Sequence, residues 1–288
     1  MRVRFPPRAQ RVRSSMVEQF PLKEAVEGSI PSGPTNMDRE RIIYSQVPKE
    51  VWDKRSRVAR VGETLFGDES ELISGSWDEA NDFVRQGKGL LVVANHPTLL
   101  DGPRIVSLLM VNPEFRGKRI VVPVAQHQFA VSEMLNKITG AELELISVVT
   151  PDTIRKKPEL ASLGKQGLFE YGRRAGEVLF QGGIVILFPQ AERRPRIGEA
   201  QNTDKSVKII MRIGENKGID FGVLPVGITI PGVDPEKARG LNIGRKAILR
   251  VGNAFSRDEL RDTAKVTGIS TDAVVYRNLQ VLVDEDYR

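Results

Sequence analysis

The sequence predicts an α/β fold, a single domain with a mostly parallel central sheet flanked by helices. Three short apolar runs, at residues 90–94, 184–188 and 223–227, have the length and continuity of strands buried on both faces. Segments of helical length separate these runs. Alternation of strands and helices is typical of a parallel sheet. We expect this domain to cover residues 76–288.

The individual elements follow from local signals. A helix from about residue 76 to 86 starts with a capping-box pattern and ends in a glycine-containing turn, which leads into the strand before residue 95. Four glycines weaken an expected helix at 159–181 by up to ~1 kcal/mol each. The remaining strands are expected at 119–124, 143–149, 184–188, 220–230 and 246–252, and the remaining helices at 128–138, 205–216, 257–265 and 271–282.

The first 75 residues differ from this pattern. Residues 1–36 are rich in proline and have no sustained helical or strand period, so we expect a disordered or non-native arm and a natural start at Met37. They also lack the continuous apolar segment of a secretory signal. A genuine disordered arm is the alternative. Residues 37–75 are expected to form a helical extension.

Composition limits the class of function. The chain has no cysteine and only two histidines, which excludes disulfides and a cysteine nucleophile and leads us to expect no metal site and no bound cofactor. Residues 1–36 carry six basic and three acidic side chains, so they hold half of the net charge of +6. A basic field for nucleic acid is therefore not expected. No apolar run approaches the ~18 residues that cross a bilayer, and we expect a cytoplasmic protein.

Residues 95–101 carry the strongest functional signal. His96 follows the first apolar run directly and stands five residues before Asp101. Ligand sites of open α/β sheets gather at the carboxyl ends of strands, and a histidine paired with a carboxylate can act as a general base. Asp101 also stands where a helix N-cap is expected, and the two interpretations are compatible. His127, the other histidine, has no such acid partner and is expected to be an ordinary polar residue at a strand end.

Two later segments extend this signal. Phe188, Pro189 and Arg193 stand at and after the end of the second apolar run, and Pro225 and Val226 stand within the third. Together with residues 95–101, and in this order, these segments resemble the motifs of the glycerol-phosphate and lysophosphatidic acid acyltransferase family over roughly residues 75 to 255. That family has an Asn-His-four-residues-Asp motif, then a Phe-Pro-Glu-Gly-Thr-Arg-Ser motif, then an apolar strand with a central proline. The matching residues are Asn95, His96, Asp101, Phe188, Pro189, Arg193, Pro225 and Val226.

The chain departs from the family pattern in the second of these motifs. Gln190, Ala191, Glu192 and Arg194 stand where the family has glutamate, glycine, threonine and serine. A further family block, a short apolar segment that ends in arginine, has its nearest candidate in residues 143–157, which include Arg155. The dyad is intact, while the region expected to hold the phosphate of the acceptor is altered.

The resemblance implies where substrate would bind. It assigns the anionic acceptor to Arg193, because a guanidinium matches the geometry of a phosphate. Arg194, Gln190, Arg155 and Asn95 are the further candidates for substrate binding. A solvated charge cluster around Arg193 and Arg194 is the alternative.

The resemblance implies acyl transfer from a thioester, acyl-CoA or acyl carrier protein, to a hydroxyl of a glycerol-phosphate or lysophospholipid-like acceptor. His96 would be the general base, Asp101 would orient it, and backbone N–H groups of residues 101–104 would stabilise the oxyanion. An amphiphilic acceptor implies peripheral association with a membrane. Two alternatives stay open: a non-catalytic lipid or phosphate-binding module, which Gln190 favours, and a hydrolase that uses water as the acceptor.

Overall fold

The computed structural model describes residues 39–42, 69–73, 76–139, 142–190, 193–194, 196–201, 205–237 and 245–288. The expected arm, residues 1–36, lies outside the described residues. Within residues 37–75, the described residues form two strands, β1 (Arg39–Ile42) and β2 (Glu69–Ile73). The rest of the expected helical extension lies outside the described residues, so the extension stays a prediction.

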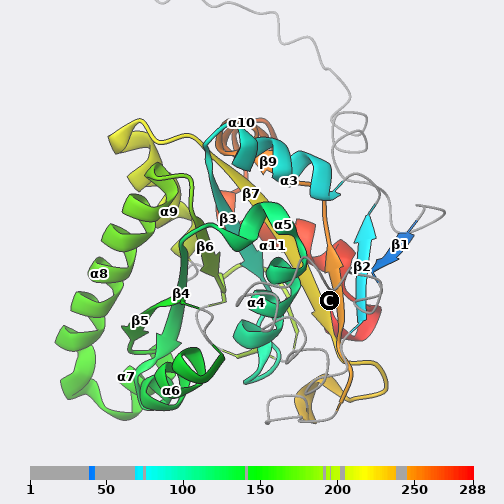
Figure 1. Cartoon of the computed structure of the whole chain (residues 1–288). Helices are drawn as coiled ribbons and strands as arrows, with labels where there is room; N and C mark the ends of the chain where they lie inside the picture. Colours follow the sequence, from blue (N-terminus) through cyan, green and yellow to red (C-terminus); the bar gives the residue numbers. More distant parts are fainter. Residues whose placement is uncertain are drawn as a thin grey trace, which may run out of the picture. The chain divides into compact units, whose positions relative to one another are not determined.

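One mixed sheet organises the described part of the chain (Figure 1). Its strands run in the order β1-β2-β8-β7-β3-β6-β4-β5, and β9 pairs with β7 beside β8. The central strands β7, β3, β6, β4 and β5 are parallel, whereas β8 and β9 are antiparallel to β7. This arrangement confirms the expected α/β fold. The strands are β3 (Gly89–Ala94), β4 (Ile120–Ala125), β5 (Glu144–Val148), β6 (Ile184–Leu187), β7 (Phe221–Thr229), β8 (Ile248–Val251) and β9 (Phe255–Ser256).

Helices cover both faces of this sheet. Gly222 and Gly227 of β7 are five positions apart, an odd offset, so they face opposite sides of the sheet. A Cβ atom on Gly222 would meet Phe83 of α3, and one on Gly227 would meet Leu282 of α11. α5 packs on α3 and α4, whereas α9 packs on α8 and α11. The helices are α3 (Ser76–Arg85), α4 (Asp101–Val111), α5 (Pro113–Arg116), α6 (Phe129–Thr139), α7 (Pro151–Lys156), α8 (Ala161–Phe180), α9 (Ser206–Lys217), α10 (Arg257–Thr267) and α11 (Thr271–Leu282).

The core lies around the three central strands. Every residue of β3, β6 and β7 is buried, as continuous apolar runs predict for strands covered on both faces. Removal of this apolar surface from water is the main force that holds the sheet and its helices together. The buried strands β3, β6 and β7 therefore hold the residues at their carboxyl ends in fixed positions.

Pro225 lies inside β7, although a proline in a central strand removes a ladder hydrogen bond. Its carbonyl accepts a hydrogen bond from the N–H of Gly252, at the place where β8 has ended and β9 has not begun. Because the N–H and C=O of a strand residue face the same neighbour, the missing donor also faces this gap. The strand can therefore hold a proline and keep its register with β3, where Pro225 lies opposite Val93.

The glycines expected to weaken α8 lie where this helix packs closely. A Cβ atom on Gly167 would come within 3.0 Å of the carbonyl oxygen of Ser147 on β5. One on Gly176 would come within 2.7 Å of Ile213 on α9. The helix continues unbroken over 20 residues. Close packing against the sheet and α9 therefore compensates for the low helix propensity of glycine.

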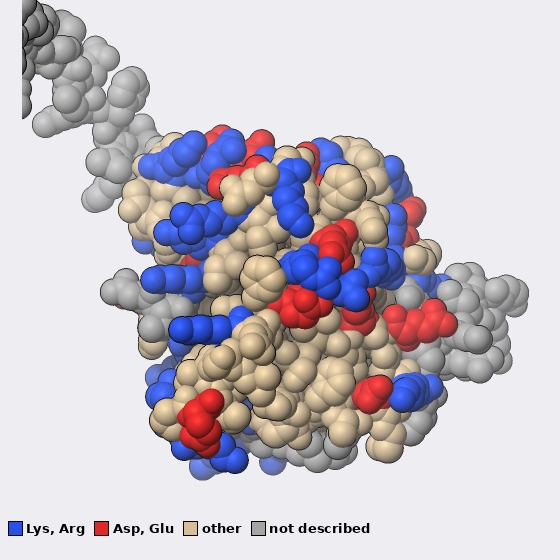
Figure 2. All heavy atoms as spheres, turned by 90° about the vertical axis from the view of Figure 1, so that its left-hand side faces the viewer, with Lys and Arg blue, Asp and Glu red and all other residues tan. Residues whose placement is uncertain are grey.

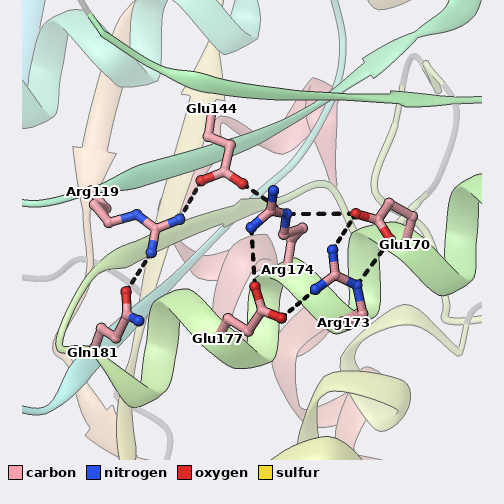
Figure 3. A network of polar contacts seen from close by, with 7 residues as sticks. All are labelled: Arg119, Glu144, Glu170, Arg173, Arg174, Glu177 and Gln181. Carbon is pink, nitrogen blue, oxygen red and sulfur yellow. Dashed lines mark hydrogen bonds and ion pairs between the residues drawn. The ribbon is translucent and has the colours of Figure 1, made fainter.

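A set of charged side chains fastens the edge strand β5 to α8 (Figure 3). Arg174 Nε lies 3.1 Å from Glu144 Oε1, and Arg119 Nη2 lies 2.6 Å from Glu144 Oε2. The hydrogen bond from Arg173 lowers the pKa of Glu170. We call this set the α8 charge network; its members are Arg119, Glu144, Glu170, Arg173, Arg174, Glu177 and Gln181.

Candidate active site

The turn after β3 brings the two candidate catalytic residues together. β3 ends at Ala94 and α4 begins at Asp101. His96 Nδ1 lies 2.9 Å from Asp101 Oδ2. The carboxylate is fully buried, whereas 22% of the His96 side chain is exposed. The pair thus combines a buried carboxylate, which accepts the hydrogen bond, with an imidazole that is partly exposed to solvent.

Asp101 is the first residue of α4 and not its N-cap. Leu100 occupies the cap position, and no side chain caps the helix there. The Asp101 carboxylate instead folds back over the turn, where Thr98 donates from its N–H to Oδ2 at 2.7 Å and from its hydroxyl to Oδ1 at 2.5 Å. The cap interpretation is therefore wrong, because these donors and His96 hold the carboxylate away from the first N–H groups of the helix.

Arg104 completes the buried part of the site. It is 1% exposed, its Nη1 lies 3.3 Å from Thr98 Oγ1 and 4.0 Å from Asp101 Oδ1, and its Nη2 donates to the carbonyl of Arg245. Thr98 Oγ1 also accepts from the N–H of Leu100 at 3.2 Å. Two donors therefore point at this oxygen, so its own proton is directed to Asp101. Both carboxylate oxygens consequently act as acceptors.

Arg104 is a residue that the sequence analysis missed. Its signal was the i, i+3 spacing from Asp101, which places both side chains on one side of a helix. An acidic and a basic residue at this spacing are common on exposed helices. The spacing indicates a functional contact here only because both side chains are buried. A buried carboxylate requires donors or a cation nearby, and Arg104 and Thr98 supply both.

The hydrogen bonds also assign the tautomer of His96. Because Asp101 Oδ2 accepts, the neutral imidazole carries its proton on Nδ1, and Nε2 is left as an acceptor. No described residue makes a hydrogen bond to Nε2. The ring stacks on Phe188, which follows β6, with ring centroids 4.3 Å apart and 23° between the planes. The site therefore presents a basic nitrogen in a fixed orientation.

Asn95 fixes the start of the turn to β7. Its side-chain Nδ2 donates to the carbonyl of Ile228 at 2.9 Å, and its Oδ1 accepts from the N–H of Ile228 at 2.7 Å. The ladder between β3 and β7 ends at Ala94 and Val226, so the amide side chain continues it by two further hydrogen bonds. Asn95 was expected among the substrate-binding residues. In the structure its side chain is buried and fixes the main chain that precedes His96 to β7.

Gln190 and the segment after it clamp the main chain of His96. Gln190 is buried; its Oε1 accepts from the N–H of His96 at 2.9 Å, and its Nε2 donates to the carbonyl of Arg196 at 3.0 Å. The N–H of Arg194 donates to the carbonyl of His96 at 3.2 Å. Both polar atoms of the Gln190 side chain are thus engaged. A carboxylate in its place would face the Arg196 carbonyl without a donor.

The three candidate arginines lie at different distances from His96. Arg193 and Arg194 are partly buried, and the backbone of Arg194 touches that of His96. Arg155 belongs to α7, beyond β5, where its guanidinium lies 3.5 Å from Asp152. β6 and β4 separate β3 from β5, a spacing of roughly 14 Å across three strand intervals. The fold therefore brings Arg193 and Arg194 to the site but leaves Arg155 at the sheet edge.

His127 lies at the end of β4, in the short 3-10 helix Gln126–Gln128, and is exposed. It is thus a polar residue at a strand end, as expected. The described residues include no group of three or more His, Asp or Glu side chains placed to hold a metal ion. Within the described part of the chain, no helix has the length and apolar character needed to span a membrane.

No protein-family model and no curated protein matches the chain. Among solved structures, it is similar to the crystal structure of the 1-acyl-sn-glycerophosphate (LPA) acyltransferase PlsC from Thermotoga maritima, with a TM-score of 0.43 and 18% sequence identity. The similarity covers 83% of this chain and 80% of the other.

Proposed function

We propose that the chain is an acyltransferase that moves an acyl group from a thioester to a hydroxyl, with His96 as the general base. The observation that carries this proposal is the His96–Asp101 pair, in which Nδ1 is held at 2.9 Å and Nε2 remains as an oriented acceptor. Its position at the carboxyl end of the central strand β3 is where sheets of this class bind ligands. The motif resemblance around His96, Phe188 and Pro225 supports the same reaction.

The reaction needs only proton transfer and charge stabilisation from the protein. Nε2 of His96 accepts the proton of the acceptor hydroxyl as that oxygen attacks the thioester carbonyl carbon. A C–O bond forms, and the carbonyl oxygen takes the negative charge. When the carbonyl re-forms, the C–S bond breaks, and the departing thiolate takes up the proton from His96. Asp101 stabilises the imidazolium in between.

Two of the four expected peptide groups can donate a hydrogen bond to the oxyanion. Of the expected stretch 101–104, Pro103 has no N–H, and the N–H of Arg104 donates to the carbonyl of Leu100. The N–H groups of Asp101 and Gly102 remain. Apart from its chain neighbours and the backbone of its own helix, no atom lies within 4 Å of the position that a Cβ would take on Gly102, so a substrate can approach this peptide closely. We assign the oxyanion to these two groups.

The acceptor is proposed to be a phosphorylated glycerolipid, with acyl-CoA or acyl carrier protein as donor and no resident cofactor. Arg193 would hold the phosphate, with Arg194 beside it, because the peptide of Arg194 already contacts that of His96. Gln190 and Asn95 would contribute by holding the main chain of the turn. The exposed position of Arg155 suits a membrane surface better than the acceptor phosphate. The protein is expected to be cytoplasmic and peripheral.

The experiment that tests this proposal uses the purified protein with acyl-CoA, with and without lysophosphatidic acid. Thiol release and phosphatidic acid formation that both require the acceptor would support acyl transfer. Equal thiol release without acceptor would indicate a hydrolase, and ligand binding without turnover a binding module. The chain offers a matched control: His96→Ala should abolish transfer, whereas His127→Ala, the only other histidine change possible, should not.

A further inference from the structure

The carboxyl edge of the sheet carries more than the His96 turn. α6 follows β4, and α7 and the first half of α8 follow β5, the outermost of the parallel strands. Because these strands are parallel to β3, the segments after them stand at the same edge as His96. In Figure 1 they form the lower left end of the domain. We call this end, residues 129–139 and 151–169, the α6–α8 corner.

Exposed apolar side chains gather on the α6–α8 corner. The described residues expose six large apolar side chains, and four of them lie here: Met134, Leu163, Leu168 and Phe169. The other two, Phe180 and Val266, lie at the carboxyl end of α8 and on α10. Helical side chains lean towards the helix N-terminus, which directs Leu168 and Phe169 to the corner. Phe180 lies roughly 16 Å further along the helix axis.

The α6–α8 corner also carries basic side chains. Lys157 and Lys165 are exposed, and within the described part of the chain neither forms an ion pair. Residues 151–169 contain four basic and two acidic side chains. Figure 2 shows this side of the molecule, where the lower half is mostly uncharged surface with both basic and acidic side chains at its edges. Apolar residues flanked by cations match the chemistry of an anionic lipid surface.

We propose that the α6–α8 corner rests on an anionic bilayer, with Leu168 and Phe169 inserted and Lys157 and Lys165 at the head groups. The value of this placement for catalysis rests on the proposed function, because it sets the His96 turn at the edge where an amphiphilic acceptor enters. The binding itself does not depend on that function. Lys165 stands three and four residues before Leu168 and Phe169 on α8, so its side chain neighbours theirs. A protein partner would not require an unpaired cation next to the apolar residues, so the lipid surface is the occupant that the charge favours.

The test is sedimentation of the full chain with vesicles of phosphatidylcholine alone, or of equal parts phosphatidylcholine and phosphatidylglycerol. Binding is expected only to the anionic vesicles, and it should weaken as salt is raised. Leu168→Ser combined with Phe169→Ser should weaken it by about tenfold or more. The matched control combines Phe180→Ser with Val266→Ser, whose side chains are 71% and 72% exposed, compared with 75% for Phe169; it should bind like the unaltered protein.

Charge reversal tests the role of the two lysines independently of the apolar side chains. Lys157→Glu with Lys165→Glu should weaken binding by at least about fivefold per residue. Lys265→Glu on α10 should have little effect. Equal losses in the control variants, binding to neutral vesicles, or self-association through this corner without vesicle binding would each overturn the proposal. Transfer to a short-chain, water-soluble acceptor should be unchanged in all these variants, so vesicle binding and the proposed activity can fail separately.

Discussion

The His96 turn and the α8 charge network both gather charged side chains, but their surroundings differ. Asp101 and Arg104 are at most 1% exposed, whereas the charged side chains of the network are 25–45% exposed. In the turn, each side-chain oxygen of Asp101 and Thr98 has a defined partner. In the network, arginines and glutamates form alternative pairs on the helix surface.

This difference teaches what each cluster can do. Removal of one partner from a buried pair leaves an uncompensated charge, which costs about 3–5 kcal/mol, so buried charges keep one geometry. Exposed pairs contribute about 0–1 kcal/mol, because water can replace either partner. A general base needs the fixed geometry of the first kind. The network needs only to fasten an edge strand to a helix.

The largest expected effect is on activity and comes from His96→Ala. Loss of a general base should lower acyl transfer by about 100- to 10,000-fold while the melting temperature stays close to that of the unaltered protein. His127→Ala is the control and should leave both unchanged. A folded His96→Ala protein that keeps more than half of the activity would rule out the proposed role.

The next prediction compares the free energy of unfolding when one arginine is removed from the His96 turn or from the α8 charge network. Arg104→Met should lower the free energy of unfolding by about 3–5 kcal/mol, because Asp101 then stays buried without its cation. Arg174→Met, in the network, should cost less than about 1 kcal/mol. Urea unfolding of both variants measures the difference. Similar losses for the two arginines would contradict the contrast between the clusters.

Gln190→Glu should have an intermediate effect. The substitution keeps the acceptor for the His96 N–H but removes the donor to the Arg196 carbonyl, which should cost about 1–3 kcal/mol. The loss should shrink as the pH is lowered, because a protonated carboxyl can donate again. Gln181→Glu is the matched control, since Gln181 accepts from Arg119 and a carboxylate can do the same. Unfolding curves at neutral and acidic pH would show the difference, and a loss independent of pH would refute this explanation.

The smallest effect is expected for Glu170→Gln. The hydrogen bond from Arg173 lowers the pKa of Glu170 in the folded protein below its ordinary value of 4.5. The pairing therefore adds stability above that value, and the stability is lost as the pH falls through the lowered pKa. The variant should be slightly less stable than the unaltered protein near neutral pH and equal to it in strong acid. High salt should also remove the difference. A difference that grows in acid would have the wrong sign.

The sequence predicted the elements well where periodicity was strong. β3, β6 and α11 lie within a residue or two of their expected bounds, because apolar runs and helical spacing are local properties. Which strands pair is not local: β3 lies between β6 and β7, each from far along the chain. The sequence could suggest that Phe188 belongs to the site, but not that its ring stacks on His96.

The sequence predicted which residues belong to the site better than it predicted which contacts each of them makes. The spacing of His96 and Asp101 indicated a dyad, and the structure brings the two side chains together. The sequence predicts Asn95 and Gln190 as contacts for substrate, whereas in the structure the Asn95 amide binds the main chain of β7 and the Gln190 amide binds that of His96 and Arg196. An amide offers a donor and an acceptor to either kind of partner, so only the fold distinguishes them. The i, i+3 spacing of Arg104 from Asp101 is present in the sequence, but only the burial of both side chains shows that they interact.

The central claim is that Asp101 orients the His96 ring with a proton on Nδ1 and an unprotonated Nε2 facing the acceptor. Because the chain has only two histidines, ¹⁵N labelling of histidine gives two imidazole spin systems, and His127→Ala assigns them. At a pH where the rings are neutral, we predict a protonated Nδ1 and an unprotonated Nε2 for His96, and loss of this preference in Asp101→Asn. A His96 ring that carries its proton on Nε2 in the unaltered protein would contradict the claim, because no base would then face the acceptor.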